Sequence, residues 1–325
     1  MFYFLNKNRL FQFILFGGMF LLCLYGIFFQ QITDIPPTAD GFLYSFLHAF
    51  FCGHPILFRI TSLVLLLLQL LLFQLILKRY DFLENDTLLP LFWFLFFYYF
   101  TIPLPCLSPA LFTPFVFLLL LSLVLNSKVK EEEGKKRIFY CASFVSLLCL
   151  LDMTNVLLLL FIFIVLIINN IDVFKKFILT LIGFVLPFIY LVAICYLSDH
   201  LADLQTHFRH LHLFGLIFID LQFSSILLLS SIGLFVLYAI PALKRYYDNK
   251  LIAIRERYAI LCCLFIVIAL EIVFENFTLS TALPYLAVPL SLFVPMLCQQ
   301  KHVRLMNDLV IGILMSGFIC LYFAI

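Results

Sequence analysis

The stretch LLCLLDMTNVLLLL (residues 147–160) decides how the whole chain is organised. Two apolar runs meet in it, and the polar side chains of Asp152, Thr154 and Asn155 separate them. If these polar residues form a turn, the flanking runs are two helices that cross a bilayer in opposite directions. If they lie within one long, broken helix, every later segment changes side.

Outward from this stretch, the chain is far more apolar than a soluble protein. Of its 325 residues, 65% are hydrophobic and 12% are charged, whereas soluble domains carry roughly 25% charged residues. A soluble fold of this length could not hide so much apolar surface. The composition therefore predicts one integral-membrane domain over residues 1–325, an all-α bundle of membrane-spanning helices without a soluble domain.

Apolar runs bounded by charged or turn residues predict about eleven spans, because a helix needs about 20 apolar residues to cross the hydrocarbon core. The runs are 10–29, 56–77, 88–104, 110–126, 138–151, 153–170, 177–197, 223–243, 258–275, 282–299 and 308–325. The first run has no small-residue cleavage site after it, so we expect a retained signal anchor. The chain contains no P-loop and no GxGxxG motif, so nothing indicates a nucleotide site.

The placement of basic residues supports eleven spans over a single broken helix. Lys and Arg favour the cytoplasmic loops of membrane proteins. With a cytoplasmic N-terminus and eleven spans, 18 of the 20 Lys and Arg residues lie inside, and only Arg59 and Arg209 lie outside. One helix over 138–170 would destroy this bias. The charge run 127–137 (SKVKEEEGKKR) is then predicted to be a solvated cytoplasmic loop.

Polar residues other than Lys and Arg gather on the predicted outer side. Six of the seven His lie there, and two outer loops, 30–55 and 198–222, hold most of these groups. In the first loop, Asp34 and Asp40 flank a Pro-Pro turn, and the apolar run 42–51 follows. This run is too short to span and predicts a short helix in the interface. Asp40 could cap that helix or serve as a catalytic carboxylate.

The second outer loop predicts an amphipathic helix. At 100° per residue, Asp199, Asp203, His207 and His210 fall within a stripe about 80° wide. Two carboxylates and two imidazoles on one face could hold a divalent metal. With Arg209, the protonated His side chains could instead bind a phosphate. A solvated helix face with no ligand is the third interpretation.

Several stretches resemble a family of uncharacterised polytopic inner-membrane proteins of Bacteroidota. They are FLNKNRLFQF (4–13), KRYDFLENDTLLPLFWFLFFYY (78–99), SPALFTPFVFLLLLSLVL (108–125), KKRIFYCASFVSLLCLL (135–151) and FKKFILTLIGFVLPFIYL (174–191). The resemblance covers roughly the first 190 residues. It implies a multi-pass protein of a bacterial inner (cytoplasmic) membrane whose outer side faces the periplasm, and it brings no established activity.

The architecture is also similar to that of integral-membrane glycosyltransferases that use polyprenyl-phosphate sugars, the GT-C type. Those enzymes have many spans, an N-terminus inside and acidic residues with interfacial helices in the first outer loop. The similarity implies Asp40 or Asp34 as a catalytic base. Residues for the substrate phosphate would then be His207, His210, Arg209, His48 and Arg59. This chain departs from the pattern, because its first loop is short and it lacks both an adjacent acidic pair and a soluble C-terminal domain.

Two functions therefore stay open. The first is an enzyme that transfers a group from a polyprenyl-phosphate carrier on the extracytoplasmic face, with a divalent metal as a candidate cofactor. The second is a non-catalytic membrane subunit of a cell-envelope assembly, or a carrier for a small lipid or solute. The expected partners are membrane lipids, a polyprenyl-phosphate-linked donor and, for the second function, another protein; nucleic acid is not among them.

Overall fold

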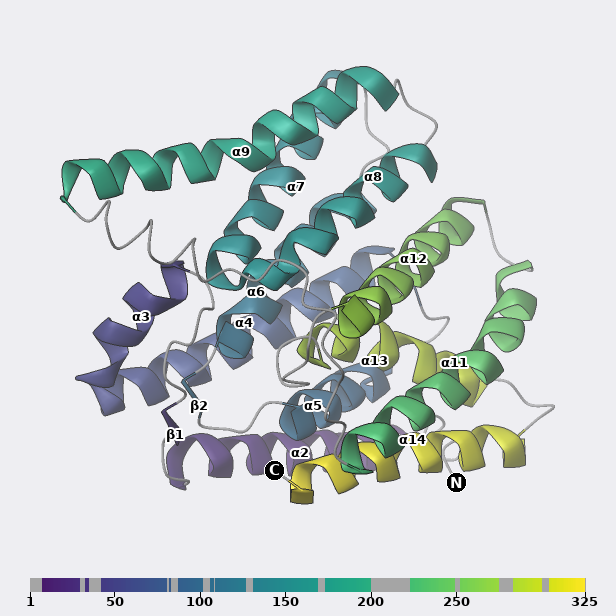
Figure 1. Cartoon of the computed structure of the whole chain (residues 1–325). Coiled ribbons are helices and arrows are strands. Elements are labelled where there is room, and N and C mark those ends of the chain that lie inside the picture. The colour runs from purple at the N-terminus through teal and green to yellow at the C-terminus, as the bar shows by residue number, and fades with distance from the viewer. Residues whose placement is uncertain are drawn as a thin grey trace.

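The computed structural model of this chain is almost entirely helical where it is described. It describes residues 8–29, 33–34, 42–80, 82, 87–101, 106–107, 109–126, 131–168, 173–199, 223–248, 252–274, 283–299 and 304–324. The elements in chain order are α2 (Arg9–Phe29), β1 (Thr33–Asp34), α3 (Phe42–Cys52), α4 (Pro55–Tyr80), α5 (Leu89–Thr101), β2 (Cys106–Leu107), α6 (Pro109–Leu125), α7 (Glu131–Leu151), η1 (Met153–Leu157), α8 (Leu158–Ile168), α9 (Val173–Leu197), α11 (Phe223–Asp248), α12 (Ile252–Phe274), α13 (Leu283–Gln299) and α14 (Arg304–Ala324). Figure 1 shows their arrangement.

The all-α prediction is confirmed, and each of the eleven apolar runs coincides with a helix. Three of the described helices are long and apolar enough to cross a membrane: Arg9–Phe29, Pro55–Tyr80 and Phe174–Leu197. The other apolar helices, such as Leu89–Thr101 and Pro284–Cys298, are shorter. Membrane association therefore follows from the structure, while the count of eleven crossings stays a prediction.

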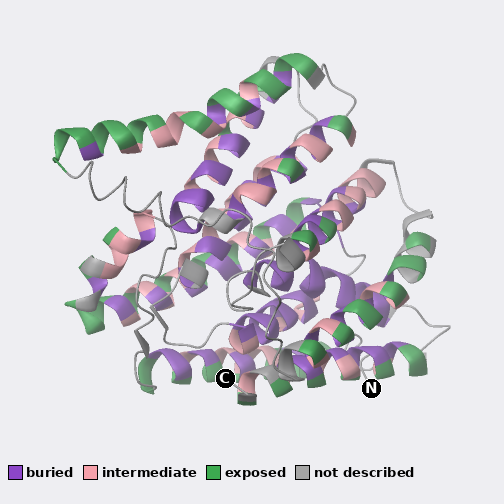
Figure 2. Cartoon of the chain, viewed as in Figure 1, coloured by how far each residue is buried: buried purple, intermediate pink, exposed green. Residues whose placement is uncertain are grey.

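The centre of the bundle is built by α5 and α13, which pack against each other. Every described side chain from Pro284 to Cys298 is buried, as are Trp93, Phe94 and Phe97 of α5. A helix that is apolar on all sides is stable only where other helices surround it. The buried core in Figure 2 accordingly runs through these two helices, and more exposed helices form the rim.

The polar residues within the stretch 147–160 form a turn. The backbone N–H of Asp152 donates to the carbonyl of Leu148 (2.8 Å), and the N–H of Asn155 donates to the carbonyl of Asp152 (3.2 Å). The Asn155 side-chain amide adds a second donation to the Asp152 carbonyl (2.8 Å). These bonds end α7 and start the 3₁₀ segment η1, and α7 and α8 form a hairpin (Figure 1). The alternative of one helix over 138–170 is wrong.

One boundary differs from the prediction. The charge run 127–137 was expected to be a loop, yet α7 begins inside it at Glu131. Three consecutive Glu residues at the first turn suit the positive end of the helix dipole. Lys135, Lys136 and Arg137 have long straight side chains that favour helix. The N-terminal end of α7 therefore extends beyond its apolar run.

Helix α9 lies at the edge of the bundle and packs mainly against α7 (Figure 1). The contact is close at Gly183, whose carbonyl accepts a hydrogen bond from the Ser143 hydroxyl (3.1 Å). A Cβ atom at Gly183 would meet the Phe139 carbonyl oxygen at 2.7 Å. Towards its C-terminal end α9 leaves α7 and exposes apolar side chains such as Ile194 and Leu197 (Figure 2).

Candidate functional site

The first predicted outer loop begins with a short backbone pairing. Strand β1 pairs in parallel with β2, so that Thr33 lies opposite Cys106 and Asp34 opposite Leu107. This pairing joins the segment after α2 to the segment before α6. The backbone of Asp34 is thereby fixed at the end of the bundle that the sequence predicts to be the outer one, while Asp40 lies outside the described residues.

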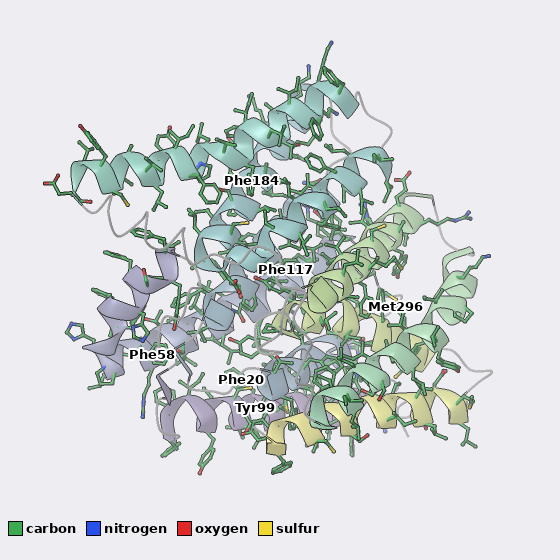
Figure 3. The ribbon with its side chains drawn as sticks, viewed as in Figure 1. Phe20, Phe58, Tyr99, Phe117, Phe184 and Met296 are labelled. Carbon is green, nitrogen blue, oxygen red and sulfur yellow. The ribbon has the colours of Figure 1, made fainter. Side chains whose placement is uncertain are left out.

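The short helix predicted over 42–51 is present as α3, and its place in the membrane interface stays a prediction. It packs against α4 and α7, and it buries Tyr44 and Phe51. Phe51 contacts the buried ring of Phe58 on α4 at a centroid distance of 6.0 Å, and Figure 3 places Phe58 between α3 and α4. On its other side α3 exposes Phe46 and Phe50. Two apolar faces, one on protein and one exposed, suit a helix that lies in a membrane interface.

His48 is the polar side chain of interest on α3. Its ring packs edge-on against Tyr44, one turn earlier, at a centroid distance of 5.9 Å. Its Nε2 atom is buried and has no hydrogen-bond partner among the described residues. A buried polar atom without a partner costs free energy, so such atoms usually have a ligand, a water molecule or a functional reason. This nitrogen is available to donate to or accept from a ligand at this end of the bundle.

Arg59 lies in the first turns of α4, close to the C-terminal end of α2. Its guanidinium donates to the carbonyl oxygen of Phe28. The last carbonyls of a helix lack partners within the helix, and a cation there is also favoured by the helix dipole. Arg59 therefore stabilises the end of α2, and its phosphate-binding role stays a prediction.

Asp199 follows the last turn of α9. Its φ angle of 58° is left-handed, and its N–H donates to the carbonyl of Tyr196 (3.4 Å). A left-handed residue commonly ends a helix, and Asp tolerates this conformation better than most residues. The structure thus gives Asp199 a place at the end of α9, with its side chain exposed.

The rest of the predicted metal and phosphate set cannot be placed. Asp203, His207, Arg209 and His210 lie outside the described residues, and so does the predicted amphipathic helix that would carry them. Among the residues that the structure does describe, no group of three His, Cys, Asp or Glu side chains could hold a metal ion.

The elements that carry the placed residues share one side of the bundle. Figure 1 shows β1, β2, α3 and the C-terminal end of α9 on the left of the view. These elements carry Asp34, His48 and Asp199, and Arg59 follows close after α3. The described part of the chain thus brings the elements that carry these four residues to one side of the bundle, and the gathering of the other polar groups there stays a prediction.

Sequence reasoning missed a second polar cluster, at the opposite end of α4. There the side chain of Arg257 on α12 contacts Tyr80, and the Tyr80 hydroxyl donates to the carbonyl of Ser122 (2.8 Å). The signal was present in the motifs KRY (78–80) and RERY (255–258), which pair cations with aromatic rings at helix ends. Nothing in the sequence indicated that the two motifs meet.

Comparison with known proteins places the chain in a family. No curated protein and no solved structure matches it. The profile of a family of unknown function, DUF6427, matches residues 31–325 and thus includes both outer loops and the helices after residue 190. Since this match covers most of the chain, the protein belongs to the family of unknown function DUF6427.

Proposed function

We propose that the protein is a membrane enzyme that transfers a sugar or a similar group from a polyprenyl-phosphate carrier on the extracytoplasmic face. The observation that carries the proposal is the buried, unpartnered Nε2 of His48 on an interfacial helix. The helix lies at the end of the bundle that also holds Asp34 and Arg59. A lipid phosphate in the interface would supply the missing hydrogen-bond partner of this imidazole.

The chemistry divides between the two outer loops. The carboxylate of Asp34 or Asp40 takes the proton of the acceptor hydroxyl while that oxygen bonds to the anomeric carbon of the sugar. The bond between this carbon and the phosphate oxygen breaks, and polyprenyl phosphate leaves with the added negative charge. The side chains of His48, Arg59, His207, Arg209 and His210 stabilise that charge through hydrogen bonds, and the arginines add their positive charge. A divalent metal on Asp199, Asp203, His207 and His210 would add to this stabilisation.

Binding of the leaving group tests the proposal directly. The purified protein in nanodiscs is titrated with undecaprenyl phosphate, and the complex is measured by native mass spectrometry. His48→Ala is expected to weaken binding about tenfold, since a hydrogen bond to a charged group is worth about 1.5–3 kcal/mol. His54→Ala is the matched control, because His54 lies just beyond α3 and is exposed. Equal affinities of the His48 and His54 variants for undecaprenyl phosphate would show that His48 does not contact this lipid. Absence of binding to the wild type would overturn the proposal.

A second candidate function is favoured by α9. Only 11% of its most apolar stretch is buried, compared with 33% for α4, a helix of similar length. An apolar helix with so little of its surface covered suits a subunit that packs against another membrane protein of an envelope assembly. Co-purification of a stoichiometric partner, lost when Ile194 and Leu197 are replaced by Gln, would favour this function over the enzyme.

A further inference from the structure

The end of α4 opposite α3 combines an apolar stripe with a basic terminus. Leu68, Leu71 and Leu75 are exposed and recur every three or four residues, so they lie on one face of the helix. Lys78 and Arg79 continue this face into the last turn, and both are exposed. In a bilayer, acyl chains cover such a stripe, and lipid headgroups lie at the level of its basic end.

A further arginine approaches this end from another helix. Nη1 of Arg257, on α12, donates to the Tyr80 carbonyl oxygen (2.9 Å), and its Cζ atom lies 5.0 Å from the centroid of the Tyr80 ring. The Cζ atom of Arg79 lies 5.9 Å from the same centroid. Arg79 and Arg257 are called the arginine cluster below.

Tyr80 holds the arginine cluster in a fixed place. Only 3% of its surface is exposed, and its hydroxyl donates to the Ser122 carbonyl on α6 (2.8 Å). Tyr258, next to Arg257, donates in turn to the carbonyl of Phe82, the described residue closest after α4. The guanidinium groups therefore rest on a packed aromatic ring and not on mobile surface side chains.

Two guanidinium groups beside one ring repel each other, and an anion between them relieves that repulsion. Guanidinium groups suit phosphate better than ammonium groups do, because their planar N–H donors match phosphate oxygens in pairs. We propose that the arginine cluster binds the phosphate of an anionic lipid headgroup, whose acyl chains lie along Leu68, Leu71 and Leu75.

The stripe identifies a lipid as the source of the phosphate. A free phosphate would need only the cations, whereas Leu75 stands one turn before Arg79 and extends the surface into the hydrocarbon region. The site lies at the opposite end of α4 from His48 and Arg59. It is therefore separate from the proposed transferase site, and either proposal can fail without the other.

Lipid titrations test this site. The full chain, purified in detergent, is titrated with phosphatidylglycerol or phosphatidylcholine, and bound lipid is counted by native mass spectrometry. We expect phosphatidylglycerol to bind the wild type at least tenfold more tightly than phosphatidylcholine. Arg79→Gln is expected to weaken the binding of phosphatidylglycerol about tenfold. Arg79→Lys is expected to weaken this binding less, because lysine keeps the positive charge.

Lys244→Gln is the matched control, since Lys244 is also an exposed cation near the end of an apolar helix, α11. It is expected to bind as the wild type does. Equal affinity for the two lipids, or an Arg79→Gln variant that binds like Lys244→Gln, would overturn the proposal. Displacement of phosphatidylglycerol by millimolar inorganic phosphate would also overturn it, because the site would then be one for free phosphate.

Discussion

The side chain of Arg257 contacts Tyr80 twice, through a hydrogen bond to its carbonyl oxygen (2.9 Å) and through its aromatic ring (5.0 Å from Cζ to the centroid). Tyr80 is the last residue of α4, so this arginine occupies the negative end of the helix dipole. The same arrangement recurs where Arg59 donates to Phe28 near the end of α2 and Arg137 to Asn126 just after α6. Three helices thus end on an arginine supplied by another part of the chain.

Replacing Arg257 should loosen the end of α4. Arg257→Ala removes a charge-assisted hydrogen bond and a cation–π contact, and it should lower the free energy of unfolding by about 1–3 kcal/mol. Arg257→Lys should lose less stability than Arg257→Ala, because it keeps the charge. It should still be less stable than the wild type, because an ammonium cannot hold both contacts equally well. Thermal unfolding in detergent ranks the variants. A lysine variant no more stable than the alanine variant would contradict the capping role.

The buried side chain of Asn307 should couple three helices. It accepts a hydrogen bond from the Tyr238 hydroxyl of α11 (2.5 Å) and donates to the Leu297 carbonyl of α13 (2.7 Å). Asn307→Ala leaves both groups without this partner and should cost about 1–3 kcal/mol. A double-mutant cycle with Tyr238→Phe measures the coupling in the free energy of unfolding. A coupling energy of zero would show that the two side chains do not interact.

Gly183 and Gly233 should respond to alanine with opposite signs. Alanine generally favours helix over glycine by about 1 kcal/mol, and at Gly233 nothing lies within 4 Å of the added Cβ atom. At Gly183 the Cβ atom would meet the Phe139 carbonyl at 2.7 Å and the Ala142 side chain at 3.1 Å. Overpacking of this kind costs about 1–3 kcal/mol. We expect Gly233→Ala to raise the thermal unfolding midpoint and Gly183→Ala to lower it; a rise for both would mean that α7 and α9 are less closely packed.

The eleven-span topology predicts which residues can be labelled from each side. In a background whose native Cys residues are replaced by Ser, Ser198→Cys after α9 should react with an impermeant maleimide in intact cells. Lys135→Cys, near the start of α7, should react only after the membrane is permeabilised. Both native side chains are exposed in the structure, so burial does not confound the comparison. Labelling of both cysteines in intact cells would reject the predicted orientation.

The sequence was sufficient to predict the helices and the turn at Asp152. Apolar runs bounded by charges predict helices strongly. In lipid no water can satisfy the backbone N–H and C=O groups, and a helix pairs them within the run itself. The short helix 42–51 was also predicted and is present as Phe42–Cys52. The start of α7 at Glu131 was missed because the apolar pattern ends before the helix does, and helix propensity and the dipole carry it further.

Contacts between distant segments were beyond sequence reasoning. The pairing of Asp34 with Leu107 rests on a two-residue strand, too short to leave an alternating pattern. The contact of Arg257 with Tyr80 joins residues 177 positions apart. His48 was named as a candidate, but its edge-on contact with Tyr44 and its unpartnered Nε2 depend on how α3 packs against α4 and α7. Composition and spacing say nothing about such packing.

A complementation assay for lipid-linked sugars tests the transferase proposal in cells. Cells that lack this protein are given the wild type, the Asp34→Ala/Asp40→Ala double variant, or the control Asp248→Ala. Asp248 lies at the C-terminal end of α11, which the eleven-span topology predicts to be on the other side of the membrane. Polyprenyl-phosphate-linked sugars and glycan products are then measured by mass spectrometry. We expect the wild type and the control to restore the product, and the double variant to leave the donor unconsumed at equal protein levels. Full restoration by the double variant would contradict the claim that these carboxylates serve a transferase site.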